Sequence, residues 1–277
     1  MLGFNIDKNV FQANINRSVI AGNLIMDIQK RQRTSGFSLF EMTIVLVIIS
    51  VVLTGLLPFI TESMQSDYAN TTVERMEAID EALRDYVSDD ATDQLPCPAD
   101  ITLEINDGDF GRGLGTVGAT TNCTSANWDA TDVTGGMIPT KTLFLPDEFA
   151  FDGWGRRFAY HVSKNLTNEN ALDAGGESEG DIIVQDFAGT NRTDDAAYVL
   201  ISHGPNGHGG YTLSGSRFDG DSENDHEQEN CDCDDDAAAG TYNNAFFQHM
   251  EAFETGETAR QFYFDDLVRF RMVSHLN

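Results

Sequence analysis

Residues 42–60 read MTIVLVIISVVLTGLLPFI, a run of 19 residues without a charged side chain. At 1.5 Å per residue in a helix, this run is long enough to cross the apolar core of a bilayer. The basic cluster Lys30-Arg31-Gln32-Arg33 precedes it, and the acidic residues Glu62 and Asp67 follow it. Because positive charge is retained in the cytoplasm, this arrangement predicts a single-pass segment with a cytoplasmic N-terminus and an exported remainder.

The charge of the chain is strongly acidic and unevenly distributed. The 277 residues carry a formal net charge of −28 at pH 7 and are 40% hydrophobic, which is enough to form a folded core. Residues 1–36 contain five basic and two acidic residues, so the acidic excess lies in the remainder. We therefore expect a soluble exported head and no contact with nucleic acid, whose phosphates require Lys and Arg.

A glutamate, Glu41, stands at the front of the apolar run. Ionisable residues in such segments are costly and are usually functional, although a glutamate that extends to the membrane interface is the alternative. A cleaved secretory signal would end in small residues, whereas Pro58-Phe59-Ile60-Thr61 stands at this position.

The segment Gly36-Phe37-Ser38-Leu39-Phe40-Glu41-Met42-Thr43 resembles the prepilin peptidase site of type IV pilins and type II secretion pseudopilins. The resemblance implies cleavage after Gly36, N-methylation of Phe37 and a pairing of Glu41 with the Phe37 amine of a neighbouring subunit. A buried amine needs such a partner. Pro58 matches a proline of many family members, where the helix can unwind on assembly; a kinked membrane helix is the alternative.

The same resemblance implies partners and a location. The partners are prepilin peptidase and other pilin or pseudopilin subunits. The location is the bacterial inner membrane, with a periplasmic head that later enters a pseudopilus or surface filament. The cleaved leader, residues 1–36, is longer than most, and Met26 would begin a leader of more usual form. Translation is therefore expected to begin at Met1 or at Met26.

A helical pattern continues after the apolar run. Apolar residues recur at spacings of three and four and predict one buried face, and Asp80 and Arg84 have the spacing of an ion pair. The helix is expected to end within residues 88–94, before Pro96 and Pro98. The apolar residues are Ala69, Val73, Met76, Ile79, Leu83, Tyr86 and Val87.

The head contains short segments that favour strands. We expect an α+β fold, in which one long N-terminal helix, with a membrane half and an amphipathic half, packs on a small antiparallel sheet with long loops. Residues 100–150 are expected to be loops with few regular elements, and the strands are expected at 158–163, 181–187, 197–202 and 262–273. The predicted divisions are a leader (1–36), a transmembrane or filament-core helix (37–60), an amphipathic helix (61–94) and the head (95–277).

Two segments of the head are similar to major pseudopilins. Residues 152–160, DGWGRRFAY, look like their Asp-x-Trp-Gly segment, and residues 202–210, SHGPNGHGG, are similar to their C-terminal loop, which binds calcium in that family. The acids Asp219, Asp221, Glu223 and Asp225 alternate beyond this loop, and their oxygens suit calcium. They do not form an EF-hand, and a solvated acidic loop is the alternative; no cofactor is certain.

Four cysteines, Cys97, Cys123, Cys231 and Cys233, allow three pairings in an exported chain. We favour a Cys97–Cys123 disulfide, while Cys231 and Cys233 either form a strained bridge across one residue or pair elsewhere. A metal site is weakly supported, since the chain has no CxxC pair or matching histidine pair.

The sequence contains no HExxH, GxSxG or Walker A motif, so an enzyme is not predicted. We expect a structural subunit that assembles through its N-terminal helix into a type II secretion pseudopilus or a type IV pilus-like filament. The alternative is a membrane-anchored exported protein for binding or adhesion that does not polymerise.

Overall fold

The computed structural model describes residues 38–88, 93–115, 123, 127–173, 179–218, 224–233, 245–248, 252–253 and 263–276, with the backbone alone at 56–62, 129, 247, 252–253 and 263. The chain divides into two units, Met1–Ile60 and Thr61–Asn277, which are considered separately.

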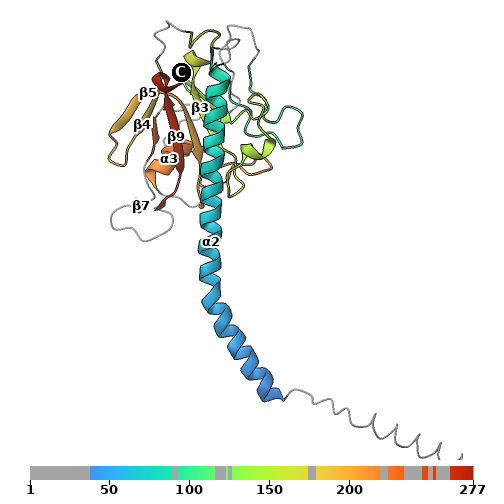
Figure 1. Ribbon diagram of the computed structural model, residues 1–277. Coiled ribbons are helices and arrows are strands. Elements are labelled where there is room, and N and C mark those ends of the chain that lie inside the picture. Colours follow the sequence, from blue (N-terminus) through green and yellow to red (C-terminus); the bar gives the residue numbers. More distant parts are fainter. Residues whose placement is uncertain are drawn as a thin grey trace, which may run out of the picture. The chain divides into compact units, whose positions relative to one another are not determined.

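The first element among the described residues is helix α2, Leu39–Ser88 (Figure 1). Its helical assignment continues through Pro58. In the first unit, every side chain from Ser38 to Gly55 is exposed, including apolar ones such as Leu39 and Val51. The predicted division of α2 into a membrane half and an amphipathic half is not confirmed.

Among the helical residues that the structure describes, no stretch combines the length and the apolar character required to cross a membrane.

The second part of α2 packs against the head. Met76, Ile79, Leu83 and Val87 are at most 3% exposed and belong to one core cluster with residues of the sheet, which confirms the predicted apolar face at these positions. The helix ends at Ser88, within the range expected from the following prolines.

The head is built on a seven-stranded sheet with the order β1-β2-β3-β5-β4-β6, in which β9 also pairs with β5. All pairs are antiparallel except β4–β6, which is parallel and was not predicted. A separate antiparallel pair joins β7 and β8. The strands are β1 Trp128–Asp129, β2 Val133–Met137, β3 Ala159–Ser163, β4 Ile182–Gln185, β5 Asn191–Ser202, β6 Ala245–Phe247, β7 Ala252–Phe253, β8 Tyr263–Phe264 and β9 Leu267–Met272.

Short helical segments lie between the strands and after β9. The elements are η1 Asp147–Ala150, η2 Lys164–Thr167, helix α3 Asp225–Cys231 and η4 Val273–His275.

Strand β5 is buried on both faces. Tyr198 and Leu200 join the core cluster that contains the buried face of α2, whereas Val199 and Ile201 join a second cluster with Trp128 and Phe246. This alternation follows the two-residue period of a strand.

Three predicted strands are confirmed as β3, β4 and β5, although β5 begins six residues earlier, at Asn191. The fourth is interrupted and forms β8 and β9. Residues 100–150 were expected to be loops with few regular elements, and the regular elements that the structure describes there are β1, β2 and η1. The glycines of β2 allow close packing, since a Cβ on Gly135 would lie 2.2 Å from Nδ1 of His161.

Asp80 of α2 is only 2% exposed and faces strands rather than its own helix. Its Oδ1 accepts hydrogen bonds from the Tyr198 hydroxyl (2.6 Å) and from Nε of Arg271 (2.9 Å). Nε of Arg269 lies 3.6 Å from its Oδ2. The sequence had suggested Arg84 as the partner of Asp80, but the arginines of β9 occupy that role.

Both disulfides are contained in the head. Cys97 is joined to Cys123, as favoured from the sequence, with their Cα atoms 5.5 Å apart. Cys231 is joined to Cys233 across the single residue Asp232.

Candidate functional site

Within the predicted processing segment, the structure describes the residues from Ser38 onward, which begin α2. Gly36 and Phe37 lie outside the described residues. The backbone N–H of Ser38 donates to Oε2 of Glu41 (2.9 Å), and the Ser38 hydroxyl accepts from the N–H of Phe40 (3.3 Å). These bonds resemble a capping box, in which serine and glutamate satisfy free N–H groups at a helix start. This role of Ser38 was not predicted, although the S-x-x-E spacing of Ser38 and Glu41 is typical of a capping box.

The DGWG segment connects the head to α2. The N–H of Gly153 donates to the Thr72 hydroxyl (2.9 Å), and Nε1 of Trp154 donates to Oε1 of Gln65 (2.9 Å). A Cβ on Gly153 would lie 2.1 Å from the Tyr68 carbonyl oxygen. Glycine is therefore needed here because the segment's backbone lies directly against the helix.

Asp152 links this segment to the loop at residues 202–210. Its Oδ1 accepts from the N–H groups of Trp154 and Arg156 at 2.9 and 2.8 Å, and its Oδ2 accepts from the Ser202 hydroxyl at 2.7 Å. Nη1 of Arg156 donates to the carbonyl of Gly204 (2.7 Å). The two segments that resemble major pseudopilins are thus joined to each other.

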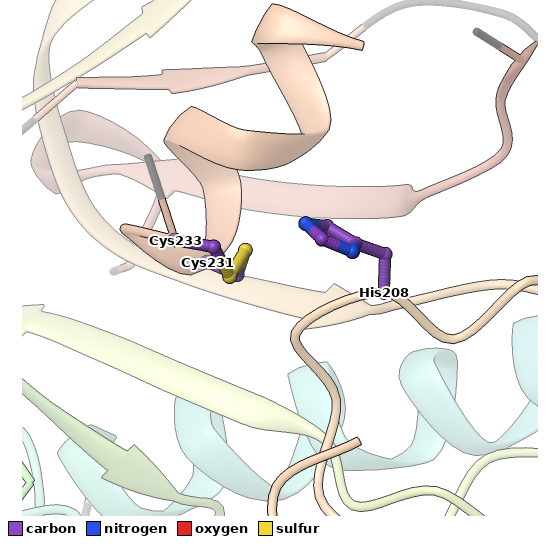
Figure 2. Close-up of side chains that lie close together, drawn as sticks. All are labelled: His208, Cys231 and Cys233. Carbon is purple, nitrogen blue, oxygen red and sulfur yellow. A yellow bond between two sulfur atoms is a disulfide. The ribbon is translucent and has the colours of Figure 1, made fainter. Parts of the chain in front are cut away.

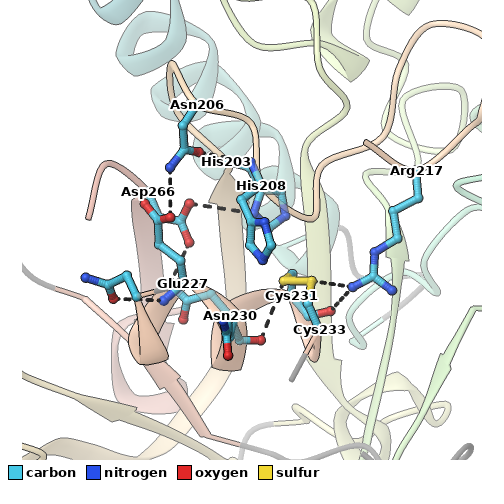
Figure 3. Close-up of a disulfide and its surroundings, with 11 residues drawn as sticks. His203, Asn206, His208, Arg217, Glu227, Asn230, Cys231, Cys233 and Asp266 are labelled. Carbon is cyan, nitrogen blue, oxygen red and sulfur yellow. Dashed lines mark hydrogen bonds and ion pairs between the residues drawn. A yellow bond between two sulfur atoms is a disulfide. The ribbon is translucent and has the colours of Figure 1, made fainter. Parts of the chain in front are cut away.

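Three acidic side chains meet beside Asn206 of the 202–210 loop, and Figure 3 labels two of them, Glu227 and Asp266. They are Glu227 of α3 together with Asp265 and Asp266, which precede β9; all are buried, and one carboxylate oxygen from each lies within 4.8 Å of the other two. Asn206 donates from its side chain to Oε2 of Glu227 (2.8 Å) and from its backbone to Oδ2 of Asp265 (3.0 Å). Asn230 donates to Oδ2 of Asp266 (2.8 Å).

Two oxygens of this carboxylate cluster, Oδ1 of Asp265 and Oδ1 of Asp266, are buried without a hydrogen bond among the described residues, and Nδ1 of His203 lies 3.6 Å from Oδ1 of Asp266. Burial, reinforced by the neighbouring carboxylates, raises the pKa of Asp265 to about 9 and that of Asp266 well above its usual value. Burial lowers the pKa of the adjacent His203 to about 4, so this histidine is neutral at pH 7. The cluster therefore holds protons or a cation at neutral pH.

The carboxylate cluster differs from the calcium ligands predicted from sequence. Asp219, Asp221 and Glu223 lie outside the described residues, and Asp225 is exposed in the first turn of α3. Their part in calcium binding stays a prediction. Asp265 and Asp266 were not predicted as ligands, because two adjacent acids carry little signal among 45 acidic residues.

Comparison with known proteins identifies the N-terminal segment. Residues 31–57 match the family described as the prokaryotic N-terminal methylation motif, which is the signature of type IV pilins and pseudopilins. The motif indicates a prepilin-like processed subunit. No curated protein and no solved structure matches the chain.

Proposed function

We propose that the chain is a pilin-like subunit that prepilin peptidase cleaves after Gly36 and that is methylated at Phe37. The methylation motif at residues 31–57 carries this proposal. In the mature protein the N-terminal helix first anchors the subunit in the inner membrane with the head in the periplasm. It then packs against the helices of other subunits in a pseudopilus or pilus-like filament. The DGWG segment favours a pseudopilus.

The exposed apolar side chains of the first unit of α2 support this role. Leu39, Phe40, Leu46 and Val51 are between 60% and 84% exposed, so they require lipid or other helices around them. A membrane-anchored adhesion protein would also need lipid here, but it would not need the Phe37 amine or the Glu41 carboxylate.

Replacing Gly36 tests the processing step. We expect Gly36→Leu to retain its leader when it is produced beside an active prepilin peptidase, because a side chain at this position blocks the approach of the backbone to the enzyme. The wild-type chain is cleaved under the same conditions, as an electrophoretic shift shows. Gly55→Leu is the control, since a Cβ at Gly55 meets nothing within 4 Å. Normal cleavage of Gly36→Leu would refute the predicted site.

We further propose that the carboxylate cluster binds one calcium ion that stabilises the head. The meeting of three buried carboxyl groups supports this proposal, because calcium supplies the positive charge that they lack. Among the described residues Oδ1 of Asp265 has no hydrogen-bond partner, and Oδ1 of Asp266 lies 3.6 Å from the neutral His203. The ion would join the 202–210 loop, through Asn206, to α3 and to the start of β9.

Calcium is expected to raise the melting temperature of the detergent-solubilised protein by roughly 5–10 °C at a hundredfold excess over Kd. The shift should be larger at pH 8 than at pH 6, because calcium must displace protons from carboxyls whose pKa is raised, Asp265 to about 9. We expect Glu227→Gln to lose the shift and Asp225→Asn to retain it. Loss in Asp225→Asn alone would place calcium in the alternating acidic loop instead.

A further inference from the structure

A second group of metal-ligating side chains lies beside the carboxylate cluster. His208, Cys231 and Cys233 each offer one ligand atom, and these atoms all lie within 4.8 Å of one another. Figure 2 shows the His208 ring beside the disulfide that joins the two cysteines. One nitrogen and two sulfurs form a ligand set of a different chemical kind from the neighbouring carboxylates.

Hydrogen bonds from backbone N–H groups hold the two segments that carry these ligands, the loop with His208 and the segment with the two cysteines. The N–H of His208 donates to Oδ1 of Asn206 (2.9 Å), and the N–H of the next residue, Gly209, donates to the carbonyl of Phe218 (3.1 Å). In the segment with the two cysteines, the N–H of Cys233 donates to the carbonyl of Gln228 in α3 (2.9 Å). These hydrogen bonds do not involve the sulfur atoms, so breaking the S–S bond removes none of them.

Gly209 allows the loop to lie against the sulfurs. Its φ is +75°, and an added Cβ would lie 2.5 Å from Sγ of Cys231 and 2.8 Å from Sγ of Cys233. Any other residue would separate the loop, and with it His208, from the cysteine pair.

Arg217 provides positive charge at the sulfurs. Its Nη2 donates to the Cys231 carbonyl (2.9 Å) and contacts Sγ of Cys233 (Figure 3). A neighbouring guanidinium favours the thiolate form of a reduced cysteine, which is the form that binds metal. Cys233 is partly exposed, so a reductant can reach the disulfide.

A cavity of about 90 Å³ adjoins Cys231 and is also lined by Gly209, Arg217 and Asn230. A water molecule occupies about 30 Å³ in the liquid, so the cavity has room for one as a further ligand.

We propose that reduction of the Cys231–Cys233 disulfide creates a binding site for a zinc-type divalent ion, with His208, Cys231 and Cys233 as protein ligands. A dithiol reductant supplies two electrons and two protons, so that the S–S bond breaks, two thiols form and the reductant becomes a disulfide. Binding of the ion then releases the two thiol protons. Thiolate and imidazole ligands select zinc, whereas the nearby carboxylates select calcium, so the two sites discriminate between the ions.

Protection from alkylation tests the site in the wild-type full-length protein. The detergent-solubilised protein is reduced with a phosphine and treated with an alkylating reagent, with or without one equivalent of Zn²⁺. Peptide mass analysis then gives the labelling rate of each cysteine. We expect Zn²⁺ to slow labelling of Cys231 and Cys233 at least tenfold and to leave Cys97 and Cys123 unaffected, while calcium protects none. Equal labelling of Cys231 and Cys233 with and without zinc would overturn the proposal.

The histidine is tested separately. We expect His208→Ala to weaken zinc binding at least tenfold in a chelator competition, and His226→Ala, on the neighbouring helix α3, to leave it unchanged. Unchanged binding in a folded His208→Ala would remove this residue from the site. The labelling experiment needs no variant, so it decides the proposal even if His208→Ala does not fold.

Discussion

Glu41→Gln is expected to be cleaved normally and to enter filaments about a hundredfold less well than the wild-type protein. Removing one partner of a buried ion pair costs about 3 kcal/mol, which corresponds to about two orders of magnitude in an association constant. The measurement is the amount of head recovered in sheared or cross-linked filaments relative to the processed membrane pool. The glutamine is chosen because it can still accept the hydrogen bond from the N–H of Ser38.

Ser38→Ala is the matched control, because it removes the hydroxyl that caps α2 and leaves the charge of Glu41 in place. Losing a helix cap costs roughly 1 kcal/mol, and we expect assembly to fall by no more than about tenfold. If Glu41→Gln assembled normally while Ser38→Ala failed, Glu41 would act as a capping residue and not as a charge partner.

Asp80→Ala is expected to destabilise the head by about 3 kcal/mol, because it leaves the buried Tyr198 hydroxyl and the guanidinium of Arg271 without their acceptor. For a domain of this size the loss corresponds to roughly 6–12 °C in melting temperature. Glu77→Ala is the control. Its side chain is 62% exposed and lies 3.7 Å from Arg269, so we expect a change within about 0.5 kcal/mol. Equal effects of the two variants would contradict the proposed importance of the Asp80 contacts.

The Asp80 contribution depends on pH. Burial alone would raise the pKa of Asp80, but hydrogen bonds from Arg271 and Tyr198 and the charge of Arg269 outweigh it and hold the pKa below its usual 3.8. A carboxyl group whose pKa is lower in the folded than in the unfolded protein stabilises the folded state at pH values above the unfolded-state pKa. This stabilisation is lost as the pH falls through the folded-state pKa. The difference in unfolding free energy between wild-type and Asp80→Ala should therefore be constant near neutral pH and decrease below about pH 4.

The sequence predicted the elements that have a local signal. The three- and four-residue spacing identified the buried face of α2 at Met76, Ile79 and Leu83, and strands rich in apolar and β-branched residues were found where they lie. The GFSLFEMT segment was sufficient to predict the methylation motif that the comparison found.

Contacts between distant residues left no such signal. Glu227 and Asp265 are 38 residues apart and meet because the N–H of Asp265 donates to Oε1 of Glu227 (2.8 Å). Arg157, just before the strand predicted at 158–163, is fully buried and donates to the carbonyls of Ile101, Thr212 and Leu213. Such positions depend on the completed fold, so periodicity and motif spacing cannot reveal them.

The most direct measurement of the central claim is the intact mass and N-terminal sequence of the mature protein extracted from membranes that contain an active prepilin peptidase. Processing of the motif predicts a chain that begins at N-methylated Phe37. A chain that retains residues before Gly36 would contradict prepilin processing and leave a membrane-anchored exported head.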